Sequence, residues 1–218
     1  MVRAAPDNVE NYRQRLNRNP DWALWEGGMH FEENNSVHNT LRNITSRLRD
    51  KQIAYAVVGG MALFQHGHRR FTEDVDLLVT AEGLKAAHDQ LEGIGYVRAF
   101  AGSKRLKDAT TGVQIDFLIT GQFPGDGKPK PVAFPDPQGS TIELSGMQVL
   151  TLPRLVELKL ASGMTGGVNR MKDLTDVVEL IKAVPLSYAF GEELNPFVRG
   201  KYLELWNELA ANPAPFES

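Results

Sequence analysis

The spacing of hydrophobic residues divides the chain into helical and extended segments. Apolar residues three to four positions apart, as at Val37, Leu41, Ile44 and Leu48, are typical of an amphipathic helix. Alternation, as in the run from Asp74 to Val79, is typical of a strand. The pattern predicts helices within 37–51, 61–65, 84–92, 151–160, 171–181 and 194–211, and strands within 53–58, 74–79, 105–109, 113–119, 142–144 and 147–150.

Turn-forming residues separate these segments. Thr110-Thr111-Gly112 and Ser145-Gly146 each lie between two predicted strands, which indicates hairpins. Thr151 is a good N-cap for the helix that follows, because its hydroxyl can accept from a free backbone N–H. The segment 121–139 carries five prolines and several glycines, and 163–167 is rich in glycine, so both are predicted to be irregular.

These segments predict a single α/β domain with helical extensions. We expect an N-terminal arm over 1–36, a core over 37–150 and a helical region over 151–218 packed on the core. The arm alternates arginines with polar residues and then presents Trp22 and Trp25. We interpret it as a partly ordered arm whose tryptophans pack onto the domain, in preference to a binding platform.

Composition narrows the function classes. The chain has 218 residues, is 42% hydrophobic and carries a formal net charge of −3, so it lacks the strongly basic character of a dedicated nucleic-acid binder. It has no cysteine, which excludes disulfides and thiolate zinc sites. The polar start of the chain does not resemble a signal peptide, and no stretch approaches the ~20 apolar residues of a membrane helix. We expect a cytoplasmic protein with no membrane partner.

Asp74 and Asp76 are the first candidates for chemistry. They are one residue apart on a predicted strand, so both carboxylates face the same side. Two like charges held close together are costly unless a cation compensates them. Mg²⁺ is usually held by one or two carboxylates together with substrate phosphates. The pair therefore indicates a magnesium site and phosphate chemistry.

Two further features fit this chemistry. Asp116 lies on the polar face of its predicted strand, opposite Val113, Ile115, Phe117 and Ile119, and would join the pair if the two strands were neighbours. A lone aspartate in a turn or an ion pair is the simpler interpretation of Asp116. Gly59 and Gly60 follow a strand and open a helix, where backbone N–H groups can approach an anion closely.

Together these residues resemble the nucleotidyltransferase superfamily that shares its core with DNA polymerase beta. The resemblance rests on Val57-Val58-Gly59-Gly60, Asp74-Val75-Asp76 and Gln114-Ile115-Asp116. Gly60-Met61-Ala62-Leu63 and Arg70-x-Thr72-x-Asp74 look like the small bacterial members, which include toxins of type IV abortive-infection systems. The resemblance implies a mixed sheet flanked by helices, a helical C-terminal part and a catalytic core within 37–150.

The resemblance also implies roles for individual residues. Asp74 and Asp76 would bind two Mg²⁺ ions, with Mn²⁺ as a substitute, and Asp116 would bind one ion and help to deprotonate an acceptor hydroxyl. The implied nucleotide-binding residues are Gly59, Gly60, Arg70, Thr72 and Lys159. Thr72 could donate to a phosphate or cap its loop. Lys159 completes an apolar helical stripe, so it could reach the triphosphate or extend its ammonium group into water.

Other charged residues have ordinary interpretations. Asp173 and Asp176 flank a predicted apolar stripe, and a solvated helix face is at least as good an interpretation as a role in the site. His66 and His68 are expected to be surface histidines, because a metal site would need a third ligand. Arg98, Lys104, Arg105 and Lys107 are expected to form a solvated face, although a role in guiding RNA is an alternative.

The sequence thus predicts an enzyme that transfers a nucleoside monophosphate from an NTP to an acceptor hydroxyl. The acceptor remains open between tRNA, a protein and a small molecule. A toxin that acts on tRNA and pairs with an antitoxin is one form of this hypothesis. The alternatives are a glycosyltransferase that holds a nucleotide sugar through Asp74-Val75-Asp76, and an inactive nucleotidyltransferase fold used as a binding module.

Overall fold

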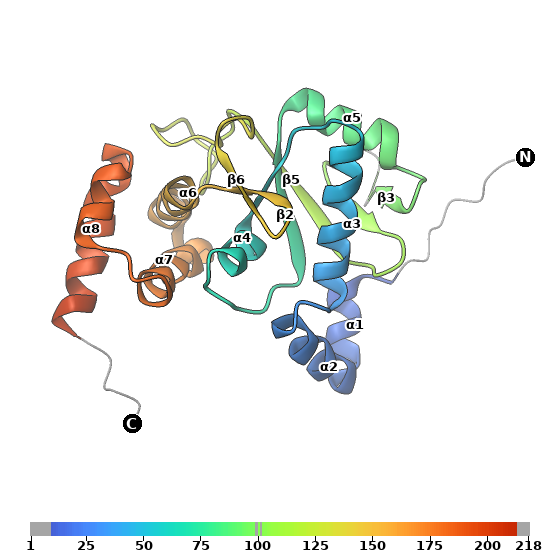
Figure 1. The fold of residues 1–218 in the computed structure, drawn as a ribbon, viewed down its shortest axis with the longest axis horizontal. Coiled ribbons are helices and arrows are strands. Elements are labelled where there is room, and N and C mark those ends of the chain that lie inside the picture. The colour runs from blue at the N-terminus through green and yellow to red at the C-terminus, as the bar shows by residue number, and fades with distance from the viewer. Residues whose placement is uncertain (1–9, 99, 101, 213–218) are drawn as a thin grey trace, which may run out of the picture.

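The computed structural model describes residues 10–98, 100 and 102–212 of the chain. Its centre is a mixed sheet of seven strands in the order β3-β4-β5-β2-β1-β7-β6. Figure 1 shows this sheet with helices around it. The strands are β1 (Ala56–Val58), β2 (Asp74–Val79), β3 (Tyr96–Arg98), β4 (Leu106–Asp108), β5 (Gln114–Ile119), β6 (Thr141–Leu144) and β7 (Met147–Leu150).

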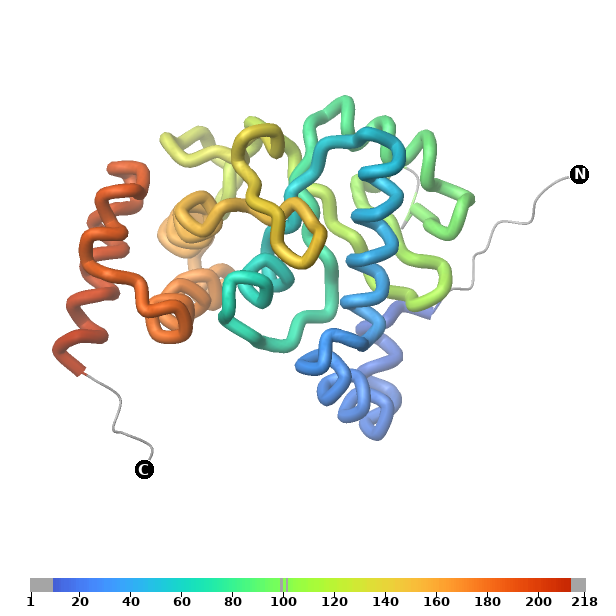
Figure 2. The backbone as a smooth tube through the Cα atoms, in the orientation of Figure 1, coloured from blue at the N-terminus to red at the C-terminus, as the bar shows by residue number. Residues whose placement is uncertain are grey.

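The helices divide into groups around the sheet. Figure 1 shows α3 in front of the sheet, and the backbone trace of Figure 2 shows that the first and last helices lie at opposite ends of the molecule. The α-helices are α1 (Tyr12–Arg18), α2 (Pro20–Phe31), α3 (Ser36–Asp50), α4 (Gly59–Gln65), α5 (Ala81–Leu91), α6 (Leu152–Thr165), α7 (Met171–Ala183) and α8 (Pro196–Ala211). Two short 3₁₀ helices are η1 (Gly167–Arg170) and η2 (Tyr188–Glu193).

The middle of the sheet is the best-buried part of the fold. β2 pairs in parallel with β5 on one side and antiparallel with β1 on the other. The apolar residues of β1 and β2 are buried, and α3, with its own buried apolar stripe, packs against β2. Burial of such side chains is the dominant favourable term in folding, so β2 is firmly fixed in the core.

Most predicted elements are confirmed. The stripe from Val37 to Leu48 is the buried face of α3, and the Asn35 side chain caps that helix by accepting from the His38 N–H. Both predicted hairpins are present, as β4 with β5 and β6 with β7. The segment 121–139 contains no helix or strand. β3 was not predicted, since only three residues of strand follow the glycines at 93 and 95.

The predicted end of the helix after Thr151 is wrong. α6 continues through Thr165, and most of the expected loop 163–167 is helical. Gly163 lies where α6 crosses α7, because an added Cβ would be 2.5 Å from the Leu174 side chain. Here the glycine permits close helix packing and does not end the helix. The Thr151 hydroxyl makes no capping hydrogen bond.

The arm predicted over residues 1–36 is ordered to a greater extent than expected. Residues 1–9 lie outside the described part of the chain, but α1 and α2 occupy most of the remainder. Tyr12 and Glu26 are each 1% exposed, and the Tyr12 hydroxyl donates to Glu26 at 2.9 Å. Trp22 packs against Tyr12, whereas Trp25 is 54% exposed. The tryptophan-packing prediction therefore holds for Trp22 alone.

The C-terminal helices pack on one another and on the core. α6 contacts α7 and α8, and it also contacts α4 of the core. The boundaries predicted at residues 36 and 150 stay predictions, and residues 213–218 of the last predicted part lie outside the described residues. In the described part of the chain, no helix is both long enough and apolar enough to cross a membrane.

Candidate functional site

A pocket of about 510 Å³ opens beside the middle of the sheet. The candidate acids, the glycine pair, residues of the proline-rich segment and residues of α6 and α7 all contribute to its walls. Every site residue predicted from the sequence lines it. These are Gly59, Gly60, Arg70, Thr72, Asp74, Asp76, Asp116 and Lys159.

The three acids converge because β2 and β5 are neighbours. The parallel pairing places Asp76 directly opposite Asp116 and Asp74 opposite Gln114. The apolar residues that alternate with them face the core, so the carboxylates share the other face. The conditional expectation that Asp116 joins the pair is therefore confirmed as a matter of geometry.

The glycine pair packs directly against these acids. Gly59 has φ of +62°, a conformation that side chains disfavour, and an added Cβ would lie 1.9 Å from Oδ2 of Asp76. At Gly60, an added Cβ would lie 2.8 Å from the Thr72 hydroxyl. Both positions thus require glycine, and the start of α4 comes as close to the acids as its backbone allows.

The pocket holds its negative charge at a cost. Burial, together with the neighbouring carboxylates of Asp74 and Asp116, raises the pKa of Asp76 to about 7, against the lowering effect of Lys159 and Lys172. Burial also raises the pKa of Asp116, although Arg105 and Gln114 oppose the change. Asp76 therefore binds a proton in part at neutral pH, which is unusual for a carboxyl group.

Hydrogen bonds and ion pairs compensate the other two acids. The Thr72 hydroxyl donates to Oδ1 of Asp74 at 2.9 Å, so it is bonded to the acid and does not cap its loop. Arg105 Nε and Gln114 Nε2 lie 2.9 and 2.8 Å from Oδ1 of Asp116. Arg105 was expected on a solvated face, but it pairs with a pocket acid although its side chain is 54% exposed.

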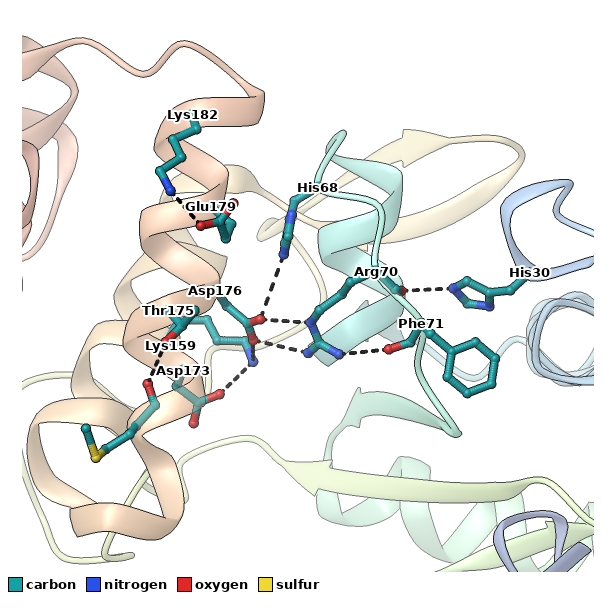
Figure 3. A network of polar contacts seen from close by, with 11 residues as sticks. His30, His68, Arg70, Phe71, Lys159, Asp173, Thr175, Asp176, Glu179 and Lys182 are labelled. Carbon is teal, nitrogen blue, oxygen red and sulfur yellow. Dashed lines mark hydrogen bonds and ion pairs between the residues drawn. The ribbon is translucent and has the colours of Figure 1, made fainter. Parts of the chain in front are cut away.

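A charge network links the segment between α4 and β2 with α6 and α7 (Figure 3), and its members Arg70, Lys159 and Asp173 line the pocket. Arg70, in the segment between α4 and β2, donates two hydrogen bonds of 2.8 and 3.1 Å to the carboxylate of Asp176 in α7. Lys159 of α6 donates to Asp176 at 2.8 Å and to Asp173 at 2.7 Å. Burial favours a higher pKa for Asp176, but Lys159 and Arg70 outweigh it and lower that pKa. The network joins the core to the C-terminal helices.

This network corrects two expectations. Asp173 and Asp176 are 3% and 5% exposed, so the solvated-face interpretation is wrong. The buried face of α7 is rotated from the predicted stripe: Met171, at the start of that stripe, is 61% exposed, while the two acids are buried. Lys159 and Arg70 compensate the charge of these acids. His66 and His68 are both partly buried rather than on the surface, and His68 lies 4.0 Å from Asp176.

The donor set of the pocket fits divalent cations. Asp74, Asp76 and Asp116 offer hard oxygen ligands on adjacent rigid strands, and their mutual repulsion raises the pKa of Asp76. Among the described residues, however, no three acidic or histidine side chains, these three acids included, already have their ligand atoms arranged to hold a metal ion. The ion pair with Arg105 and the hydrogen bonds of Gln114 and Thr72 account for this, since they direct carboxylate oxygens to other partners.

Two solved structures of one antibiotic-resistance factor, ANT(2'')-Ia, are similar to this chain. The chain is similar to the solution structure of the antibiotic-resistance factor ANT(2'')-Ia, with a TM-score of 0.51 and 14% identity over 79% of this chain and 96% of that chain. A crystal structure of ANT(2'')-Ia with adenylyl-2''-tobramycin gives a TM-score of 0.50 and 12% identity over 77% and 97%. The chain has the nucleotidyltransferase fold. No protein-family model and no curated protein matches the sequence.

Several of the residues that line the pocket were not predicted from the sequence. Ser162 donates to Asp173 at 2.7 Å, and Arg170 and Lys172 line the same side of the pocket. Phe123 and Phe134 of the proline-rich segment form an apolar wall. One signal in the sequence could have predicted the pairing of Lys159 with Asp173 and Asp176. A lysine on an apolar stripe needs an acid if it is buried, and these two acids share the face of α7 that carries Val177 and Leu180.

Proposed function

We propose that this protein is a Mg²⁺-dependent nucleotidyltransferase that moves a nucleoside monophosphate from an NTP to an acceptor hydroxyl. One observation carries the proposal: Asp76 and Asp116 are paired across β2 and β5, with Gly59 packed against Asp76. The neighbour ANT(2'')-Ia has been solved with an adenylylated aminoglycoside, which supports nucleotidyl transfer to a hydroxyl as an activity of this fold.

The acids would hold the metal. Asp74 and Asp76 would contact two Mg²⁺ or Mn²⁺ ions and Asp116 one of them, and bound Mg²⁺ would neutralise phosphate charge and lower the pKa of the acceptor hydroxyl. The raised pKa of Asp116 suits a group that takes the hydroxyl proton. The acceptor oxygen then bonds to the α-phosphorus, the bond from that phosphorus to the bridging oxygen breaks, and pyrophosphate leaves.

The remaining walls would bind the nucleotide. Backbone N–H groups at Gly59 and Gly60 lie at the start of α4, where phosphate oxygens are favoured. The Arg70 guanidinium and the Lys159 ammonium are both in the pocket wall and would add positive charge toward the triphosphate. Thr72 would keep Asp74 oriented through the hydrogen bond it already makes.

The acceptor class is the most open part of the proposal. Arg105, Arg170 and Lys172 add positive charge to the pocket lining, which suits the backbone of an RNA such as tRNA. We therefore favour an RNA such as tRNA over a protein or small-molecule acceptor, and a cytoplasmic toxin that modifies tRNA and pairs with an antitoxin is one form of this proposal.

The deciding experiment is incorporation of α-labelled NTP. Purified protein is incubated with cell extract, Mg²⁺ and each NTP in turn, and labelled material is sorted into RNA, protein and small molecules. We expect label in one class with one NTP, and none with Asp76→Asn, which keeps the size of the side chain. Equal labelling by the variant would overturn the proposal.

Two alternatives give different results. A glycosyltransferase would be stabilised against heat by a nucleotide sugar with Mg²⁺ and not by an NTP. A binding module would label nothing and would hold its partner equally well after Asp74→Ala. The binding-module alternative draws on one observation, the absence among the described residues of ligand atoms already arranged to hold a metal ion.

A further inference from the structure

The helical pair α1–α2 touches the segment that leads into the acids. This segment runs from Arg69 to Asp74 and carries Arg70, Thr72 and the first acid of the pocket. No residue of α1 or α2 lines the pocket, but Arg13 of α1 reaches its edge, with Nη2 4.0 Å from Oδ2 of Asp74. The other contacts are His30 with the Arg70 carbonyl at 2.9 Å, Glu33, just beyond α2, with Arg69 at 3.2 Å, and Arg13 with Glu73.

His30 makes the central contact in a single protonation state. Its ring is fully buried, and burial lowers the pKa of His30, so the imidazole is neutral. The Arg70 carbonyl can only accept, which places the proton on Nε2. Nδ1 then accepts from the Asn35 side-chain amide at 3.2 Å. Both ring nitrogens are therefore satisfied, and the ring orientation is fixed.

Arg70 is held from two sides (Figure 3). His30 binds its carbonyl, while Asp176 binds its guanidinium with hydrogen bonds of 2.8 and 3.1 Å. A third hydrogen bond joins the guanidinium to the Phe71 carbonyl at 3.2 Å. The place of the guanidinium in the pocket wall thus depends on a backbone position that α2 fixes.

We propose that His30 is a positioning residue of the pocket. Through His30, the helical pair α1–α2 holds Arg70 in the position in which it binds the nucleotide. The helical pair fixes the backbone of segment 69–74, and Asp176 directs the Arg70 side chain from there. Loss of the His30 hydrogen bond would let the guanidinium move away from the triphosphate. This inference rests on the proposed function for its binding readout, but not for its spectroscopic one.

Three variants separate positioning from packing. His30→Leu removes both ring hydrogen bonds, and His30→Gln restores an N–H donor of similar reach. His38→Leu is the matched control, because it removes a ring that packs on His30, with ring centroids 4.9 Å apart, and that interacts with the His30 backbone, but it leaves the hydrogen bond of His30 to Arg70 in place. Titration calorimetry with Mg²⁺ and each of the four NTPs should show affinity about 3- to 10-fold weaker in His30→Leu. His30→Gln should recover it, and His38→Leu should leave it unchanged.

A ligand-free measurement tests the same inference independently. The Nε–H of Arg70 gives an NMR signal that Arg70→Lys removes, and its hydrogen bond to Asp176 protects it from exchange. We expect a shifted and faster-exchanging signal in His30→Leu, but not in His38→Leu. An unchanged signal in His30→Leu overturns the inference, as do equal losses of NTP affinity in the two leucine variants. If no NTP binds wild type while the signal responds as expected, the proposed function fails and the positioning role stands.

Discussion

Gly59 and Asp76 are in such close contact that a methyl group cannot fit between them. An added Cβ at Gly59 would lie 1.9 Å from Oδ2 of Asp76, and the backbone there has φ of +62°. We therefore expect Gly59→Ala to displace the Asp76 carboxylate and to abolish Mn²⁺ binding. The left-handed conformation alone should cost about 1–2 kcal/mol of stability, measurable by urea unfolding.

Gly27→Ala is the matched control for this change. Gly27 lies within α2, and an added Cβ would meet no atom within 4 Å. Alanine is the better helix former, so this variant should be stabilised by up to about 1 kcal/mol and should bind Mn²⁺ normally. A Gly59→Ala protein that behaves like Gly27→Ala would contradict the close packing of α4 against the acids.

The raised pKa of Asp76 predicts how stability depends on pH. The folded-state pKa of about 7 exceeds the unfolded value of about 3.9, so the folded protein binds the extra proton. This contribution to stability is complete below pH ~4 and is lost as pH rises through about 7. In the absence of metal, wild type should therefore lose stability between these limits relative to Asp76→Asn.

Thermal melts of wild type and Asp76→Asn between pH 4 and 8 check this prediction. Asparagine carries no charge at any pH, so at pH 8 without metal the variant should melt higher by several degrees, since about 1 kcal/mol shifts Tm by about 2–4 °C. Added Mg²⁺ should raise the Tm of wild type only. Parallel pH profiles for the two proteins would show that Asp76 titrates normally.

The central strands could be predicted because their residues are locally unambiguous. The alternation from Asp74 to Val79 and from Gln114 to Ile119 indicates strands whose acids face one side, and the structure confirms it. Their adjacency could not be derived from alternation, because pairing order is a property of the whole sheet. The resemblance to a known family supplied that step.

The charge network was missed for a different reason. An acid near an apolar stripe is usually solvated. Asp173 and Asp176 can be buried because cationic side chains from other segments, Lys159 and Arg70, compensate their charge. Asp176 lies 106 residues from Arg70 and 17 from Lys159, so no local pattern links the three. The N-terminal helices were missed because their buried residues are mostly polar or aromatic, namely Tyr12, Glu26 and His30, with Leu16 as the one aliphatic side chain among them.

Asp176 should be required for stability more than any surface acid. Asp176→Asn removes the carboxylate partner of Arg70, whose side chain is 30% exposed, and leaves the buried Lys159 with Asp173 alone. Breaking a fully buried ion pair typically costs about 3–5 kcal/mol, which is the upper limit for this change. The pKa of Asp176 is lowered in the folded state, so its contribution is present above the unfolded pKa of about 3.9 and disappears as pH falls through the folded value. The difference between wild type and variant should be largest near neutral pH.

Urea unfolding at pH 7 and in acid tests this expectation. Asp89→Asn is the control, because Asp89 forms an exposed helical ion pair with Lys85 and its side chain is 58% exposed. Such pairs contribute roughly 0.3–0.5 kcal/mol. If Asp176→Asn lowers the free energy of unfolding by no more than Asp89→Asn does, the charge network does not stabilise the fold as its geometry indicates.

Arg105 should oppose metal binding in the resting pocket. Its Nε lies 2.9 Å from Oδ1 of Asp116, so a divalent cation that binds this oxygen must displace a positive charge. Arg105→Gln should therefore bind Mn²⁺ about 2- to 5-fold more tightly at low ionic strength, the size expected for a partly exposed ion pair. The gain should shrink in ~0.5 M salt, because salt screens exposed charges. Arg98→Gln is the control, since Arg98 pairs with Glu92 and does not line the pocket. Weaker Mn²⁺ binding in Arg105→Gln would show instead that the arginine holds Asp116 in the geometry that the metal needs.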